Sequence, residues 1–416
     1  MRRIHLVSLV LILILGLAIF AALKLDLLSL FRAAPEKPVK EEPAPEPEPE
    51  PEPDIRTATL TAVGDMFPHR PQIDGAHQGG GNYDFSTSFK YLKPHFQASD
   101  LTTLDLETNQ AGADRGYSGF PAFNAPLQLS KDLKEAGVDL YICATNHIVD
   151  RSLSGLQATL KNVRKLGFIT TGAYLSREER DTPVIVDLNG IKVAFISYTY
   201  GIEGSIPAGH EYAVNIAPGF EDISPVLSDI KSARKAGADL VAVYPHWGQM
   251  YLFEPTEKMR NDAKKFAAAG ADMILCGHAH VLQPLDWIYT AEEDGSKRPT
   301  LVVYSMGNFF TNQQYLPPDI PTDMVEYGIL LGLELSKDMN TGEAWVSDVD
   351  YKIHWCHRGW RHRILILSEV FEKGAAEYNL SAAQFDRLKA KYRENEKILE
   401  RYGFSDNPPA RIKENR

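Results

Sequence analysis

Cysteine is scarce in this sequence, and so is any surplus of positive charge. The 416 residues include 3 cysteines, too few and too scattered for a disulfide scaffold or a cysteine zinc site. Lys and Arg number 44 against 55 Asp and Glu, for a formal net charge of −11. This balance argues against a nucleic-acid partner. Hydrophobic residues make up 44%, as in chains that fold around a core, and the length predicts one large or two modest globular domains.

One long apolar run lies near the N-terminus, at residues 6–23, interrupted only by Ser8 and Gly16. At about 1.5 Å per residue it would span roughly 27 Å, close to the ~30 Å hydrocarbon core of a bilayer. Arg2 and Arg3 precede it, so the positive-inside rule places the N-terminus in the cytoplasm. We predict a cytoplasmic stub and single-pass cell-membrane anchor over residues 1–33, with the main domain extracytoplasmic. A cleaved signal peptide is the alternative, but the run is longer than a usual signal core and no A-x-A site follows.

Prolines and glutamates alternate in the next segment, whose end reads APEPEPEPEPEPD. Proline cannot join a sheet or a helix interior, and like charges hold the chain open. Residues 34–56 are therefore predicted to form an extended extracytoplasmic spacer. The rest of the chain is predicted to form a main domain over residues 57–355 and a polar, helical C-terminal extension over residues 356–416.

Short apolar, β-leaning runs alternate with helical patterns in the main domain. The runs lie at 58–63, 101–106, 138–144, 240–244, 273–276 and 301–304, with later strands predicted at 328–335 and 345–353. Helical patterns lie at 128–136, 153–166, 225–236 and 257–268. Asn189-Gly190, between the runs 183–188 and 191–199, predicts a type I′ hairpin. The alternation predicts an α/β fold with buried sheets.

Polar residues follow five of these strands at the point where each one ends. In open α/β sheets the ligand site lies beyond the carboxyl ends of the strands, so we expect these side chains to meet. All are oxygen or imidazole donors: Asp65, Glu107, Asn146, His246, His278 and His280. Such a set suits Mn²⁺, Fe²⁺ or Zn²⁺, with Mg²⁺ as a further candidate. One or two divalent ions are the predicted cofactor, and a pair of ions can polarise a phosphoryl or acyl oxygen.

Each of these residues taken alone also has an ordinary structural explanation. Asp65 suits a helix N-cap, Asn146 the start of a helix, and Glu107 the surface. His246 is compatible with a buried histidine of the core. The His-x-His pair at residues 278–280 is the most specific single feature. It is the convergence of five strand ends that favours a metal centre over these separate explanations.

Three further residues are predicted to act on a substrate. His147 can protonate a leaving group or stabilise negative charge. Asp150, one helical turn on, can accept a hydrogen bond from that ring, although it would also suit the first turn of a helix. Arg70 can clamp an anionic group. His69 beside it is either a further ligand or an exposed side chain.

Six motifs stand in order along the main domain. They are Gly64-Asp65-Met66 with Arg70, Leu106-Glu107, Thr145-Asn146-His147 with Asp150 and Gly155-Leu156, His246-Trp247-Gly248, His278-x-His280-Val281-Leu282-Gln283, and Tyr304-Ser305-Met306-Gly307-Asn308-Phe309. Together they resemble the CapA-type capsule synthesis proteins of poly-γ-glutamate biosynthesis. The resemblance covers roughly residues 57–335, and a single anchor before an outward domain is also typical of that family.

The CapA-type family is similar in fold to the calcineurin-like metallophosphoesterases. The resemblance therefore implies a sandwich of two packed mixed β-sheets flanked by helices, with a two-metal site. The ligands it implies by position are Asp65 and His280 for one ion, Asn146, His246 and His278 for the other, and Glu107 as the bridge. His147 would be the substrate-facing acid. The chain departs from the family where Asp105 stands in place of a usual Asn and Met250 in place of a frequent Glu.

The function implied is that of a membrane-anchored, extracytoplasmic metal-binding protein of poly-γ-glutamate capsule biosynthesis or export. Its expected partners are the membrane, the anionic polymer or its precursor, and other membrane subunits of a capsule synthesis complex. In an enzymatic form it would be a metal-dependent hydrolase. The alternatives are a non-catalytic scaffold subunit of that complex and a general extracytoplasmic metallophosphoesterase.

Overall fold

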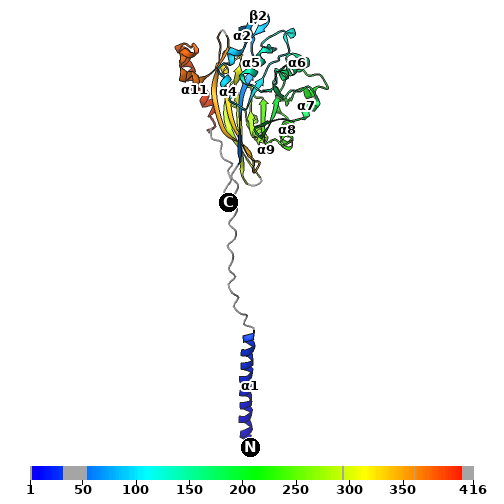
Figure 1. Ribbon diagram of the computed structural model, residues 1–416, viewed down its shortest axis with the longest axis vertical. Helices are drawn as coiled ribbons and strands as arrows, with labels where there is room; N and C mark the ends of the chain where they lie inside the picture. Colours follow the sequence, from blue (N-terminus) through cyan, green and yellow to red (C-terminus); the bar gives the residue numbers. More distant parts are fainter. Residues whose placement is uncertain (1, 31–53, 293–294, 360, 405–416) are drawn as a thin grey trace. The chain divides into compact units, whose positions relative to one another are not determined.

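The structure is a computed structural model that describes residues 2–30, 54–292, 295–359 and 361–404 (Figure 1). Contacts divide the chain into two units, residues 1–52 and residues 53–416. In the first unit the helix α1 (Arg2–Leu30) contains the apolar run. Within the part of the chain that the structure describes, no helix is at once long enough and apolar enough to cross a bilayer. The predicted anchor is therefore not confirmed, and residues 34–53 of the predicted spacer lie outside the described residues.

Two β-sheets form the centre of the second unit. The strands of the first sheet are β1 (Ile55–Met66), β4 (Leu101–Leu106), β5 (Leu140–Ile142), β6 (Ile169–Thr171), β13 (Asn308–Phe310), β14 (Tyr327–Asp338), β15 (Ala344–His357) and β16 (Arg363–Ile366). Their order is β16-β15-β14-β1-β4-β5-β6, with β13 also paired to β1. The strands of the second sheet are β7 (Val184–Leu188), β8 (Ile191–Thr199), β9 (Leu240–His246), β10 (Met273–Leu275), β11 (Leu282–Ala291) and β12 (Lys297–Met306). Their order is β11-β12-β10-β9-β8-β7, and both sheets mix parallel and antiparallel pairs.

The second sheet is buried on both faces, as the side chains of β9 show. Leu240, Ala242 and Tyr244 belong to the apolar core that the two sheets share. Val241 and Val243, which alternate with them, belong to a separate core on the outer face. Successive side chains of a strand point to opposite faces, so a strand covered on both sides reads as an unbroken apolar run.

Helices cover the outer faces of the two sheets. Residues of α5 (Gln128–Ala136) and α6 (Ser152–Lys165) pack in the outer core of the first sheet. Residues of α8 (Ser224–Lys235) and α9 (Glu257–Ala269) pack in that of the second. The smaller elements are α2 (Arg70–Ala76), β2 (His77–Gly79), β3 (Asn82–Tyr83), α3 (Ser86–Phe89), α4 (Lys93–Gln97) and α7 (Arg177–Asp181). This arrangement of two packed sheets flanked by helices confirms the predicted α/β architecture.

The hairpin predicted at Asn189-Gly190 is confirmed. β7 and β8 pair antiparallel, with Leu188 opposite Ile191. Asn189 has φ 54° and Gly190 has φ 88°, and positive φ at both central residues is what a type I′ turn requires. Asn and Gly tolerate this left-handed conformation better than other residues, which is why the Asn-Gly pair alone predicted the turn.

The C-terminal region differs from the predicted helical extension in one respect. β15 runs past residue 355 to His357, and β16 pairs with it antiparallel, so these two stretches complete the first sheet before α10 begins. Helices then follow as predicted, α10 (Leu367–Lys373) and α11 (Ala382–Leu399). Ser381 and Gln384 form a capping box at the start of α11. β16 was not predicted because the strand is short and begins with the polar residue Arg363, after Arg361 and His362.

The two sheets meet beyond the end of β12. After Met306 the chain passes Gly307 and enters β13, which leaves the second sheet and pairs parallel with β1 of the first. The backbone N–H of Asp65 donates to the Gly307 carbonyl at 3.1 Å. A Cβ on Gly64 would lie 2.0 Å from that same oxygen, so only glycine permits this approach. The carboxyl ends of strands from both sheets are thereby brought to one place.

Candidate metal centre

Carboxylates from the first sheet face imidazoles from the second where the sheets meet. Asp65 lies at the end of β1, Asp105 near the end of β4, and Glu107 directly after it. His246 ends β9, and His278 and His280 lie in the loop between β10 and β11. Their potential ligand atoms form three groups, each within 4.8 Å: Glu107 with His246 and His278, Asp65 with Glu107 and His280, and Asp65 with Asp105 and His246. All six residues are buried.

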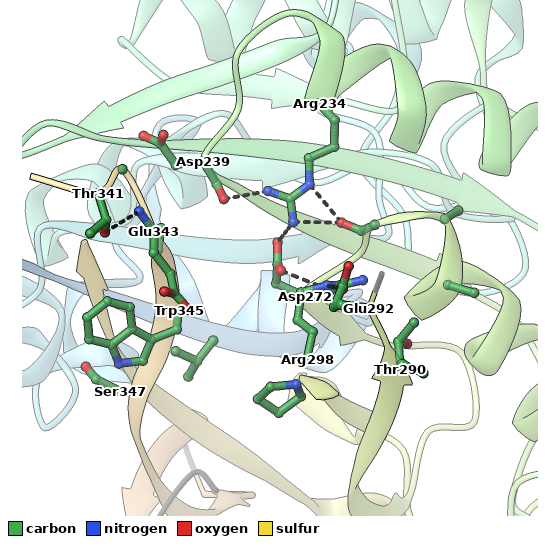
Figure 2. A pocket seen from close by; sticks show the side chains of 18 residues that line it. Arg234, Asp239, Asp272, Thr290, Glu292, Arg298, Thr341, Glu343, Trp345 and Ser347 are labelled. Atoms are coloured by element: carbon green, nitrogen blue, oxygen red, sulfur yellow. Dashed lines mark hydrogen bonds and ion pairs between the residues drawn. The ribbon is translucent and has the colours of Figure 1, made fainter. Parts of the chain in front are cut away.

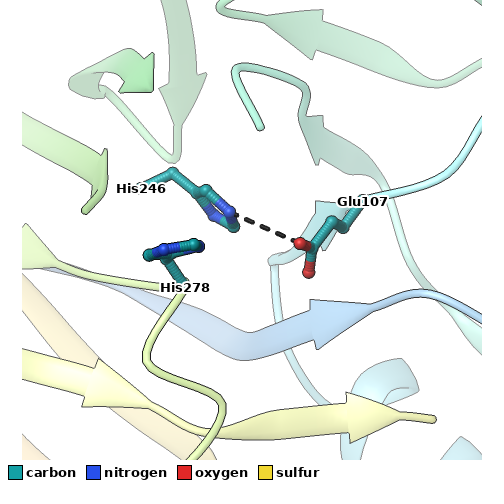
Figure 3. A group of neighbouring side chains, drawn as sticks. All are labelled: Glu107, His246 and His278. Carbon is teal, nitrogen blue, oxygen red and sulfur yellow. Dashed lines mark ion pairs between the residues drawn. The ribbon is translucent and has the colours of Figure 1, made fainter. Parts of the chain in front are cut away.

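Glu107, like Asp65 and His246, belongs to two of these groups. Its side chain is 0% exposed, and neither carboxylate oxygen has a hydrogen-bond partner among the described residues. Oε1 lies 3.5 Å from Nε2 of His246 and 4.0 Å from Nε2 of His280. Figure 3 shows Glu107 pointing toward His246, with His278 beside it. A buried carboxylate without hydrogen bonds is costly unless a cation is close.

Asp65 is held on the other side of the cluster by the His-x-His loop. The backbone N–H of His278 donates to Asp65 Oδ2 at 3.0 Å. His280 Nδ1 lies 3.1 Å from Oδ2 of Asp65 and 3.0 Å from Oδ1 of Asn308. With Nδ1 engaged by these two oxygens, Nε2 of His280 is the nitrogen directed toward Glu107.

The side chains of Asp105 and Asn146 fix the orientation of the His246 ring. Its Nδ1 lies 3.3 Å from Asp105 Oδ2, while its Nε2 lies 2.9 Å from Asn146 Oδ1. Glu203 accepts a hydrogen bond from the Asn146 side-chain amide at 3.3 Å, which fixes the amide with its oxygen toward His246. A carboxylate behind a histidine selects the tautomer that presents the other nitrogen, as around many protein-bound metal ions.

The charges of the cluster are strongly coupled. Burial raises the pKa of Asp105 to about 7, and the charges of Asp65 and Glu107 add to this, against the hydrogen bond with His246. Burial opposes the charged form of His246, but its contacts with Asp105 and Glu107 outweigh burial and raise its pKa well above the usual value. For Asp65 too, burial is outweighed, by the hydrogen bond and charge of His280, and its pKa is lowered. Burial lowers the pKa of His278 well below its usual value.

These shifts predict that metal binding releases protons. The His246–Asp105 pair retains a proton at neutral pH in the ion-free protein, and a cation beside Nε2 of His246 must displace it. Because the cation must displace the proton of His246, whose pKa is raised, affinity for Mn²⁺ or Zn²⁺ should fall as the pH drops through the neutral range, by roughly tenfold per pH unit for each proton displaced. Below about 7, where Asp105 also binds a proton, the fall should be steeper. Calorimetric titration in buffers of different ionisation enthalpy measures both quantities. An affinity that is flat from pH 6 to pH 8 would contradict this proton linkage.

The loop that carries the two histidines has an unusual backbone. His278 has φ 85° and His280 has φ 58°, a left-handed conformation that costs free energy for residues other than glycine. Such strain persists where surrounding contacts impose it, often at functional sites. Here the contacts are those of the cluster itself.

Gly277 in the same loop leads to a second prediction. A Cβ at this position would lie 2.4 Å from Asp65 Oδ1 and 2.6 Å from Asp105 Oδ2. Gly277→Ala should therefore displace one carboxylate and weaken metal binding by roughly tenfold or more, as loss of a supporting contact does. Metal content by elemental analysis checks this. Gly201→Ala is the control, because nothing lies within 4 Å of a Cβ there and its φ is not positive, and equal metal content in both variants would contradict the prediction.

His147 and Asp150 are paired as predicted. Nδ1 of His147 lies 2.9 Å from Asp150 Oδ2, and the same oxygen accepts the backbone N–H of Phe123 at 2.7 Å. The Phe123 ring stands edge-on to His147, with 4.8 Å between ring centroids. The imidazole is thus fixed from two sides, with Nδ1 engaged by Asp150.

Arg70 is not brought into the cluster. It begins α2 and is largely exposed, and its Nε forms an ion pair with Asp74 at 2.8 Å. Its Nη1 donates to the Tyr117 carbonyl at 3.2 Å. The predicted role as an anion clamp finds no support in these contacts.

Four residues around the cluster were not predicted to belong to the site. Asp105 and Asn308 support His246 and His280, and Glu203 orients Asn146. The Tyr200 ring packs on His278, with centroids 4.5 Å apart. A signal existed for Asp105, because residues i and i+2 of a strand point to the same side and Glu107 was already a candidate.

A large cavity elsewhere in the protein is not part of this centre. It has a volume of about 1040 Å³ and is lined by Arg234, Asp239, Asp272 and Arg298 among others. Asp239 and Asp272 directly precede β9 and β10, so the cavity lies at the opposite ends of those strands from the histidines. Figure 2 shows Arg234 and Arg298 on either side of Asp272, with which both form ion pairs, and Arg234 also donates to the backbone carbonyl of Asp239. We therefore assign it a structural role.

The fold and the cluster together define an α/β protein whose residues fit a divalent cation. The donor set of carboxylate oxygens and imidazole nitrogens suits such ions, and the Glu107 carboxylate has no hydrogen bond among the described residues. Residues 59–313 match the family described as bacterial capsule synthesis protein PGA_cap. The chain belongs to this family, which confirms the resemblance that its motifs indicated.

Two curated relatives match about three fifths of this chain. The capsule biosynthesis protein CapA of Bacillus anthracis is 27% identical over 61% of this chain and 60% of its own length. The PGA biosynthesis protein CapA of Bacillus subtilis (strain 168) is 29% identical over 60% of this chain and 62% of its own length. The chain thus matches about three fifths of the length of these relatives.

Solved structures show a more distant likeness. A phosphatase from Mycoplasma pneumoniae matches with a TM-score of 0.41 and 15% identity, over 72% of this chain and 94% of that one. A hypothetical protein from Thermus thermophilus matches with a TM-score of 0.36 and 14% identity, over 71% of this chain and 98% of that one. These scores are too low to say anything about the chemistry of this chain.

Proposed function

We propose that this chain is a membrane-anchored, extracytoplasmic, metal-dependent hydrolase of poly-γ-glutamate capsule production, acting on the polymer or an anionic precursor. The observation that carries the hydrolase proposal is Glu107, fully buried, without a hydrogen bond among the described residues, and facing imidazoles. The capsule role is supported by family membership. The location is supported by the apolar run at residues 6–23 and the arginines before it.

The residues divide between holding the cation and handling the proton. Asp65 and His280 would hold one ion, and Asn146, His246 and His278 a second, with Glu107 between them. Bound divalent ions would supply Lewis acidity at the scissile group and lower the pKa of a water. Asp105 keeps Nδ1 of His246 protonated and so directs Nε2 inward. Asp150 does the same for His147, so the proton that leaves for the departing group is the one on Nε2.

The test uses the full-length chain, purified with its metal content measured. Hydrolysis is followed on γ-linked polyglutamate, by chain length, and on p-nitrophenyl phosphate. His147→Ala should keep its metal and lose roughly 100-fold or more in rate, the usual range for a general acid. His280→Ala should lose both metal and activity. His77→Ala, at an exposed histidine outside the cluster, is the control.

Each outcome decides between this proposal and its alternatives. Metal without turnover on either substrate would overturn the hydrolase proposal in favour of a scaffold subunit. Cleavage of the phosphoester alone would favour a general phosphoesterase. Protein without stoichiometric metal at neutral pH would overturn the metal centre itself. Recovery of the chain in the membrane fraction, lost when residues 1–33 are deleted, tests the anchor separately.

A further inference from the structure

A pocket lies beside the loop that follows β13. It has a volume of about 500 Å³ and is lined by parts of the segment 314–326, by Arg358 just after β15, and by Arg387 on α11. None of the described residues that line it belongs to the three groups of candidate ligands. Two arginines that face one pocket are typical of sites that bind carboxylate or phosphate groups.

A buried carboxylate holds these two arginines in place. Glu326 is 2% exposed, and its Oε1 accepts a hydrogen bond from Arg358 Nη2 at 2.7 Å. Its Oε2 accepts from Arg387 Nη2 at 3.1 Å and from Trp355 Nε1 at 2.9 Å. Asp323 accepts a further hydrogen bond from Arg387 Nη2 at 3.1 Å. Both guanidinium groups are therefore fixed before a ligand arrives, which reduces the entropy that binding costs.

The hydrogen-bonding capacity left over in this pocket consists mainly of donors. The oxygens of Asp323 accept from Arg387 and from Lys391, and those of Glu326 are engaged as well. In both arginines only Nη2 is bonded, while Nε and Nη1 have no partner among the described residues. The side chains of Arg358 and Arg387 are 32% and 37% exposed. Guanidinium N–H groups within reach of solvent are thus available to an acceptor.

The ligand that fits these donors is an anion recognised at short range. The two arginines and the two acids that line the pocket, Asp323 and Glu326, cancel in formal charge, so net charge does not draw anions in from a distance. Selection then comes from hydrogen bonds to guanidinium N–H groups, which are strongest for a charged oxygen. A γ-linked glutamate chain presents such oxygens repeatedly, because each residue keeps a free α-carboxylate.

Two segments connect this pocket to the metal centre. Asn308, which supports one of the candidate histidine ligands, donates through Nδ2 to Gln313 Oε1 at 2.9 Å and to the Val325 carbonyl at 2.8 Å. The residues that follow these two acceptors in the chain, Gln314 and Glu326, line the pocket. The walls of the pocket therefore continue directly into the support of the centre.

We propose that this pocket binds the free carboxylates of a γ-linked glutamate chain whose reacting part lies at the metal centre. This inference rests on the proposed function, which supplies the polymer. Arg358 and Arg387 donate to the carboxylates, and Glu326 keeps both guanidinium groups in position. Binding a polymer away from its reacting bond holds that bond in place at the site of the chemistry.

The experiment measures binding of a fluorescent γ-linked glutamate oligomer to the metal-loaded, full-length chain by anisotropy. Every protein carries His147→Ala, so that turnover does not consume the probe, and the protein without further change is the reference. Arg358→Gln and Arg387→Gln should each keep the metal and weaken binding about tenfold, as for loss of a hydrogen bond to a charged group. The same oligomer with amidated carboxylates should bind the reference at least about tenfold more weakly.

Tyr315→Glu tests the same pocket without breaking an ion pair. Tyr315 lines the pocket and is 58% exposed, so glutamate there should leave the fold intact, and its charge should weaken binding of the oligomer about fivefold. Two matched controls should bind like the reference. Arg361→Gln removes an arginine that pairs with Asp84 at 2.9 Å outside the pocket, and Tyr289→Glu changes a tyrosine that is 45% exposed elsewhere.

The outcomes separate the pocket from the proposed function. Binding like that of the reference in both arginine variants or, should these fail to fold, in Tyr315→Glu would overturn the role of the pocket alone. Equal weakening in Arg361→Gln would overturn it as well, by showing a general effect of positive charge. Tight binding of the amidated oligomer would overturn the carboxylate as the ligand. Failure of the reference to bind the oligomer would overturn the polymer as substrate and this inference with it. Arginine-dependent binding without turnover by the wild type would overturn the hydrolase and leave the pocket.

Discussion

Replacing Glu107 by glutamine is expected to reduce metal affinity by roughly 100-fold or more, because changes to residues that merely support ligands already cost 10–100-fold. Glutamine has nearly the same shape, so packing is preserved. What is lost is the negative charge at the point where the imidazole nitrogens of His246 and His280 converge. Elemental analysis of the purified variant and a competitive titration with a metal chelator measure the effect.

Glu326 offers a matched control for this substitution. Like Glu107 it is buried, at 2% exposure, but its oxygens accept hydrogen bonds from Trp355 at 2.9 Å and from Arg358 at 2.7 Å. Glu326→Gln should lower stability and leave the metal content unchanged. Equal metal loss in both variants would show a general effect of disturbing a buried carboxylate, and full metal content in Glu107→Gln would remove Glu107 from the centre.

The largest expected effect on stability is at Asp272, in the cavity that Figure 2 shows. Its carboxylate accepts the backbone N–H of Val241 at 2.7 Å and pairs with both Arg234 and Arg298. Asp272→Ala would leave two arginines without their shared partner and should lower the free energy of unfolding by about 3 kcal/mol, within the range for breaking a buried pair. Urea unfolding at pH 7 measures it.

Glu292 is the matched control for Asp272. It also pairs with Arg298, at 2.8 Å, but is more exposed, and exposed pairs contribute below about 1 kcal/mol. Glu292→Ala should therefore have a small effect, and neither change should alter metal content, since both residues lie at the opposite strand ends from the histidines. A similar loss of unfolding free energy in the two variants would contradict the view that burial makes the Asp272 ion pairs the stronger ones.

The sequence predicted those residues of the candidate site that lie at or just after the ends of strands. Apolar runs located the ends of β1, β4, β9 and β10, and the residue following each run was readable as a ligand type. The His-x-His pair added specificity. Once two sheets align their carboxyl ends, Asp65, Glu107, His246 and His280 have to meet, and the structure brings them together.

The sequence did not predict the residues that support the candidate ligands, nor the direction in which Arg70 points. Glu203 reaches the cluster from an irregular segment, which has no periodicity to fix where a side chain points. Asn308 begins β13, a strand of three residues that is too short to show a pattern. Arg70 was predicted to face the substrate, but Asp74 lies one helical turn away and pairs with it, as i,i+4 residues on a helix readily do. The positive charge of Arg70 alone does not distinguish a substrate anion from Asp74 as its partner.

The candidate ligands come from two different sheets, which has a consequence for the stability of the protein. Asp65, Asp105 and Glu107 belong to one sheet and the histidines to the other, so a bound cation would act as a cross-link between the halves of the sandwich. Its binding free energy would then add to the resistance of the whole fold against unfolding. Chains that fail to acquire their ion would be the first to be degraded, and the abundance of the protein would follow the supply of the metal.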